Sequence, residues 1–206
     1  MFNIGQIYKY NRETFYDYNT GAQQSRVLYA GTIIFISLIF ATGFSELSDN
    51  ALAAIITAQS ILAGFGFNVL FFLLSNANVL PSKKEGSIEQ DLRRNKIIAL
   101  SEEIFGNISY FNLVSISSVF LSLLIFIPSL SSTTTEYCVK YLMDNFHDYY
   151  EQIRNLALIA KMALRVLLFT ILYILVFESI YTFIRTVVRI TFYFRKRLEF
   201  LRTADQ

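Results

Sequence analysis

Residues 166–184 read VLLFTILYILVFESIYTFI and contain a single charged side chain, that of Glu178. Three further stretches are apolar and nearly free of charge, at residues 27–44, 51–74 and 113–130. A helix needs roughly 20 apolar residues to cross about 30 Å of hydrocarbon, and fewer where the bilayer thins locally. The four stretches therefore predict an all-α fold, a four-helix transmembrane bundle.

Composition limits what else the chain can contain. It has 206 residues, 54% of them apolar, and a mean hydropathy of +0.43. Most of the apolar residues lie in the four spans, so residues 1–206 are predicted to form a single membrane domain. Cys138 is the only cysteine, which excludes an internal disulfide and the four-span thiol oxidoreductases. Glu13 and Asp17 interrupt residues 1–26, which are therefore interpreted as an aromatic-rich arm and not as a signal peptide.

Lysine and arginine are unevenly distributed among the segments outside the spans. Residues 1–26, 81–112 and 185–206 are rich in them, residues 45–50 have none, and residues 131–161 have few. Because loops rich in lysine and arginine stay in the cytoplasm, both termini are predicted to be cytoplasmic. The basic residues assigned to docking of lipid or of a cytoplasmic protein are Lys83, Lys84, Arg93, Arg94, Lys96, Arg195, Lys196, Arg197 and Arg202.

Two helices are predicted to extend beyond the bilayer. Apolar residues recur at helical spacing from 88 to about 127, so residues 81–112 are interpreted as a cytoplasmic helical stalk, with a possible break at Gly106 and Asn107. The fourth span is predicted to continue as a basic cytoplasmic tail, residues 185–206. Residues 131–161 form the external segment, with a short amphipathic helix near 139–146. Residues 3–18 fit either a short helix along the headgroups or a loosely ordered arm.

Glu178 is the only acidic residue inside a span, and a carboxylate in hydrocarbon must be paired or protonated. Arg185 and Arg189 follow it on the same helical face. We expect these residues to form an intramembrane ion pair or an oligomer contact, with a proton or ion pathway as the alternative.

Small polar residues form a stripe on each of two spans. Such residues let helices approach closely where lipid provides no hydrophobic drive for association. The stripes predict helix packing, within the subunit or between copies, and a polar pore lining that includes Gln59 is the alternative. Their members are Thr57, Ser60, Gly64 and Asn68 in the second span and Ser115, Ser118 and Ser122 in the third.

Patterns typical of enzymes are missing from the sequence. It has no zinc-protease motif, no glycine-rich phosphate loop and no nucleophile elbow. His147 is the only histidine, and a single imidazole among scattered carboxylates is a poor metal cage. We therefore expect no catalytic activity, no cofactor, no metal and no direct contact with nucleic acid.

The size, the four spans at 27–44, 51–74, 113–130 and 166–184, and the basic inward segments 83–96 and 185–202 resemble the membrane subunit of the Kiwa antiphage defence system. The resemblance covers the whole chain and is one of architecture. It implies an inner-membrane homo-oligomer that senses envelope disturbance caused by phage and holds or releases a cytoplasmic effector.

Two functional hypotheses follow. The first is an oligomeric membrane sensor or scaffold, for instance a tetramer, with the lipid bilayer and a cytoplasmic protein as its partners. The second is a pore or channel, either a defence effector or a holin-like protein, whose path would be lined by Glu178, Gln59 and Asn68.

Overall fold

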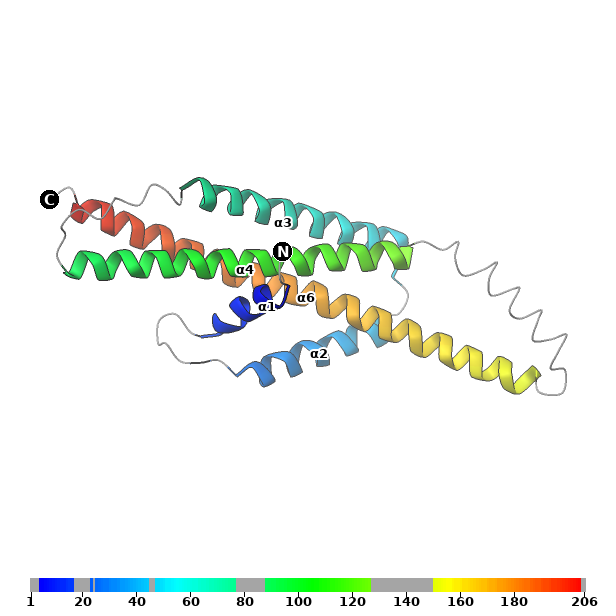
Figure 1. Ribbon diagram of the computed structural model, residues 1–206. Helices are drawn as coiled ribbons and strands as arrows, with labels where there is room; N and C mark the ends of the chain where they lie inside the picture. Colours follow the sequence, from blue (N-terminus) through cyan, green and yellow to red (C-terminus); the bar gives the residue numbers. More distant parts are fainter. Residues whose placement is uncertain are drawn as a thin grey trace.

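The computed structural model describes residues 4–16, 23, 25–44, 47–76, 88–126 and 150–204. The regular secondary structure within these residues is α-helical, and one isolated antiparallel β-bridge pairs Tyr16 with Gln23. The helices are α1 (Ile4–Glu13), α2 (Arg26–Gly43), α3 (Asp49–Asn76), α4 (Ile88–Phe126) and α6 (Tyr150–Ala204) (Figure 1). The predicted all-α class is confirmed, and residues 4–13 of the N-terminal arm are helical.

Four of these helices are long and apolar enough to cross a membrane. They are α2, nearly all of α3, residues 95–125 of α4 and residues 154–199 of α6. The prediction of a multi-pass membrane protein is therefore confirmed. Ser25 begins the first of these helices as an N-cap, since its Oγ accepts a hydrogen bond from the Leu28 backbone N–H at 3.4 Å.

The last helix starts earlier than its apolar stretch suggests. It has 55 residues, contains neither glycine nor proline, and begins at Tyr150, so residues 150–161 of the predicted external segment belong to it. At 1.5 Å per residue it is about 80 Å long, more than twice the thickness of the hydrocarbon core. Three predictions lie outside the described residues: the amphipathic helix near 139–146, the position of His147, and docking at Lys83 and Lys84.

The bundle is built around α4 and α6. Helix α4 packs against both α3 and α6, α2 packs chiefly against α6, and α1 packs against α4 (Figure 1). The N-terminal part of α6, in yellow, projects past the other helices, and Leu156, Ile159 and Met162 on it are exposed (Figure 1).

The buried apolar residues form two separate clusters at the two ends of the bundle. One consists of Leu73, Ile97, Leu100, Ile104, Ile108 and Tyr193, and the other of Ala41, Leu52, Phe169, Leu172 and Tyr173. Between them the buried side chains are mostly polar, among them Gln59, Ser115 and Ser179. Polar contacts therefore occupy the centre of the bundle.

Candidate functional site

The carboxylate of Glu178 is held by two tyrosines from two other helices. The Tyr29 hydroxyl of α2 donates to Oε2 at 2.6 Å, and the Tyr110 hydroxyl of α4 donates to Oε1 at 3.2 Å. The sequence predicted an ion pair with Arg185 or Arg189, or an oligomer contact, for Glu178. These two hydrogen-bond partners within the chain are phenols, and a contact between copies stays a prediction. A hydroxyl satisfies a carboxylate at membrane depth without adding a second charge.

Arg189 pairs with a different carboxylate. Its side chain is 3% exposed, and Nη1 lies 2.6 Å from Oε2 of Glu103 on α4. Its Nη2 donates to the backbone oxygen of Thr14 at 2.5 Å. Glu103 is 26% exposed, so the buried side of this pair is the arginine. Removing Glu103 would leave the Arg189 charge buried without its carboxylate, a change that costs up to about 3–5 kcal/mol for fully buried pairs.

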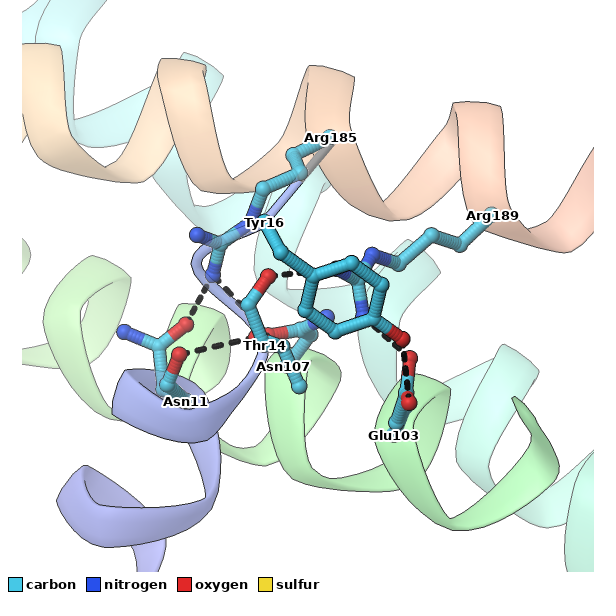
Figure 2. A network of polar contacts seen from close by, with 7 residues as sticks. All are labelled: Asn11, Thr14, Tyr16, Glu103, Asn107, Arg185 and Arg189. Carbon is cyan, nitrogen blue, oxygen red and sulfur yellow. Dashed lines mark hydrogen bonds and ion pairs between the residues drawn. The ribbon is translucent and has the colours of Figure 1, made fainter. Parts of the chain in front are cut away.

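The end of α1 and the residues after it, 11–16, form a short segment that we call the N-terminal strap. Asn11, Thr14 and Phe15 in it are all buried. Figure 2 shows the strap lying between α4 and α6, where its polar groups reach toward side chains of both helices. This segment joins the N-terminus to the bundle.

Arg185 is the second arginine that holds the strap. Its Nη2 donates to the side-chain oxygen of Asn11 and, at 2.9 Å, to Oδ1 of Asn107 on α4. The Thr14 hydroxyl donates to the same Asn107 oxygen at 2.8 Å (Figure 2). The guanidinium lies 4.4 Å from the centre of the Phe15 ring, a cation–π distance.

Tyr16 completes the network from the strap side. Its hydroxyl donates to Oε1 of Glu103 at 2.5 Å, so the two oxygens of Glu103 bind Tyr16 and Arg189 (Figure 2). The four charged residues of this region, Arg185, Arg189, Glu103 and Glu178, sum to zero formal charge. The region is therefore neutral as a whole, although it lies within apolar helices.

A glycine allows α1 to approach α4. A Cβ added at Gly106 would lie 2.9 Å from Cβ of Tyr10, closer than such atoms approach in real structures. The sequence left open a break at this glycine, but α4 continues through it without interruption. Gly106 thus provides space for α1 and does not kink the helix.

The serine stripe of α4 faces the inside of the bundle. Ser115, Ser118 and Ser122 are each 0% exposed. Nearby, the Ser179 hydroxyl of α6 donates to Oε1 of Gln59 on α3 at 2.9 Å, which joins two helices across the buried centre. These residues pack helices within the single chain.

The stripe of α3 faces the other way. Thr57, Ser60, Gly64 and Asn68 are all exposed, and a Cβ added at Gly64 would meet no atom within 4 Å. Within the described residues none of the four is buried between helices, although Asn68 borders a hollow shared with Ile190 and Tyr193 of α6. Packing between copies, the other interpretation of this stripe, stays a prediction.

The basic residues assigned to docking are spread over two helices. Lys96, Arg195, Lys196 and Arg202 are exposed, and Arg197 is half-buried. Arg195 and Lys196 both contact Glu199, at 3.3 and 2.8 Å. Arg93 and Arg94 belong to α4.

The sequence did not single out most of the site. It named Glu178, Arg185 and Arg189, but not the other polar residues that contact them. The missed residues are Asn11, Thr14, Tyr16, Tyr29, Glu103, Asn107 and Tyr110. The one available signal was the pair Glu103 and Asn107, four residues apart and flanked by buried Ile104 and Ile108.

The fold and the site define a class of protein: a multi-pass helical membrane protein whose N-terminal segment is bound to the bundle by two arginines of α6, of which Arg189 is buried and Arg185 is half-buried. Within the described residues, no group of three or more His, Cys, Asp or Glu side chains gathers as metal ligands would. No family model, curated protein or solved structure matches this chain.

Proposed function

We propose that this chain is an oligomeric sensor or scaffold of the bacterial inner membrane that recruits or regulates a cytoplasmic effector. Its termini, the stalk of α4 and the tail of α6 face the cytoplasm in this proposal, as the distribution of basic residues indicates. A role in antiphage defence rests on the architectural resemblance to the Kiwa membrane subunit.

The observation that carries the proposal is the bound N-terminal strap. Arg185 and Arg189 of α6 hold it, and the same helix then continues through exposed Arg195 and Lys196 to Ala204. The helix that carries the basic tail therefore contacts both the strap and, through Glu178, the helix α2. Such a connection suits a protein that relays a change in the membrane to a partner.

The partner experiment uses charge reversal at one end of α6. Arg195, Lys196 and Arg197 are changed together to glutamate, and the tagged membrane protein is purified from its native cells together with the product of each neighbouring gene. We expect the partner to be lost, because a basic docking surface has become acidic. Arg154→Glu with Lys161→Glu, exposed residues at the opposite end of α6, is the matched control. A partner retained by the triple variant would contradict docking at this tail.

The proposed contact between copies is the exposed stripe of α3. Asn68 presents a side-chain amide on the outside of an apolar helix, where lipid offers no hydrogen-bond partner. Native mass spectrometry of the detergent-solubilised protein gives the copy number. We expect Gly64→Leu to lower it, whereas Ala58→Leu, exposed on another face of α3, leaves it unchanged. Equal copy numbers in both variants would exclude this face as the contact.

A pore is the second candidate, and one observation favours it. Buried polar atoms of Asn112, Ser115, Ser122 and Thr182 have no hydrogen-bond partner within the described part of the chain, although they lie at the centre of the bundle. Gln59 is buried among these helices, whereas Asn68, which was also assigned to the path, lies outside. Recording from planar bilayers separates the two candidates: a pore gives single-channel currents that Glu178→Gln alters, and a sensor gives none.

A further inference from the structure

The strap and the intramembrane carboxylate share one residue of α2. The Tyr29 ring packs against Phe15 of the strap, with centroids 5.1 Å apart, and against Tyr181 of α6 at 4.4 Å. The hydroxyl of the same tyrosine donates to Glu178. Any shift of α2 along α6 that separates Tyr29 from Glu178 therefore also disturbs the packing of Phe15.

A second contact joins α2 to the strap. Nη2 of Arg26, the first residue of α2, donates to the backbone oxygen of Arg12 at 2.6 Å. The first turn of α2 thus touches the strap through Arg26 as well as through Tyr29. The strap is attached to α2 and to the α4–α6 pair at once.

The strap can leave without exposing an unbalanced charge. Its buried members Asn11, Thr14 and Phe15 are neutral, and two arginines balance two glutamates without them. It is held by hydrogen bonds to Arg185, Arg189, Asn107, Glu103 and Arg26, and by one buried aromatic ring, that of Phe15. Ile104 and Ile108 on α4 belong instead to an extended apolar cluster.

The helix α2 is also the span on which the bilayer acts most directly. It has 18 residues against 28 in α3, and 11% of its span is buried against 39% for α4. A helix of that length reaches about 27 Å, so it is the first to be too short when the bilayer thickens.

We propose that the N-terminal strap is a clamp whose closure depends on the position of α2, with Tyr29 as the coupling residue. The strap is closed when Tyr29 binds Glu178 and packs on Phe15, and it opens from Arg185 and Arg189 when α2 moves. This inference deepens the proposed sensor function. It rests on that function because the change in the membrane that moves α2 is taken to be the signal that the sensor detects.

Hydrogen exchange of the full-length protein in lipid nanodiscs tests the clamp. In Tyr29→Phe, which lacks the hydroxyl bound to Glu178, we expect backbone amides of residues 11–16 to exchange about tenfold faster, as the loss of one hydrogen bond to a charged group allows. Tyr173→Phe is the matched control, because Tyr173 is buried in the apolar cluster at the other end. Unchanged exchange at residues 11–16 in folded Tyr29→Phe would overturn the proposal.

A second measurement uses the unaltered protein, so the test does not depend on the folding of a variant. In nanodiscs of phosphatidylcholine with progressively longer acyl chains, exchange of residues 11–16 should rise together with that of residues 26–32. A strap that exchanges at the same rate at every chain length would count against the clamp. Partner purification with the tail variants is independent of both measurements, so a failed clamp and a failed effector-recruiting function are told apart.

Discussion

Ser115, Ser118 and Ser122 on α4 are fully buried, whereas Thr57, Ser60, Gly64 and Asn68 on α3 are exposed. Both stripes consist of small polar residues at helical spacing in an apolar span, and the sequence predicts the same packing role for both. In the part of the chain that the structure describes, the serine stripe is the one of the two that is buried between helices. The difference shows that a stripe of small polar residues indicates a surface suited to close helix packing. Which helix packs against that surface depends on how the helices are arranged.

The largest difference is expected from a bulky side chain placed in each stripe. Ser118→Leu inserts a large group where the present side chain is 0% exposed, so we expect a loss of about 3 kcal/mol or more in the free energy of unfolding. Ser60→Leu, on the exposed stripe, should leave that free energy unchanged. Unfolding in detergent measures both variants. If both variants lost the same free energy of unfolding, the claim that one stripe is buried within the chain and the other is exposed would be contradicted.

Two glycines of α3 offer a sharper comparison, since they are two residues apart and face different ways. A Cβ at Gly66 would overlap Oδ1 of Asn112 and lie 3.1 Å from Cδ1 of Phe111, whereas at Gly64 it meets no atom within 4 Å. We expect Gly66→Ala to lower the free energy of unfolding by about 1–2 kcal/mol, because neighbours must shift. The same substitution at Gly64 should leave it unchanged or raise it by up to about 1 kcal/mol through helix propensity.

The smallest effect is expected from a single buried hydroxyl. Ser179→Ala removes the hydrogen bond to Gln59 that joins α6 to α3, and bonds of this type in membranes average about 0.6 kcal/mol. Ser117→Ala is the control, because that hydroxyl donates to the Leu113 carbonyl of its own helix. A double-mutant cycle of Ser179 with Gln59 measures the coupling directly, and a coupling of zero would contradict the contact.

Much of the fold could be predicted because lipid imposes one rule on every span. A backbone in hydrocarbon must satisfy its own hydrogen bonds, so a long apolar stretch is a helix whatever its neighbours are. The positions of α2 and α3 follow from this rule, whereas the start of α4 near Ile88 is predicted from the helical spacing of its apolar residues. The start of α6 at Tyr150 does not follow from the rule, because apolarity marks where a helix enters the membrane and not where it begins.

The site was only partly predictable, for a related reason. Glu178 stands out because a charge in an apolar stretch is costly, and the sequence alone shows that the residue lies in such a stretch. Its partners Tyr29 and Tyr110 give no such signal, because a single tyrosine near the end of a span is common at the membrane–water interface. Tyr29 is 149 positions and Tyr110 is 68 positions away from Glu178 in the sequence. Nothing in the residues near Glu103 or Thr14 indicates that Arg189 will lie between them.

The sequence by itself thus determined the helical class, the number of apolar spans and the one acidic residue inside the apolar stretches 27–44, 51–74, 113–130 and 166–184, because each depends on the transfer of a side chain from water to lipid. Only the tertiary structure decided which face of each helix is inward, which hydroxyls bind Glu178 and which segment Arg185 and Arg189 hold. Those choices depend on how helices pack against one another. Because lipid is as apolar as the side chains, burial alone does not favour one packing partner over another, and shape and hydrogen bonds select it.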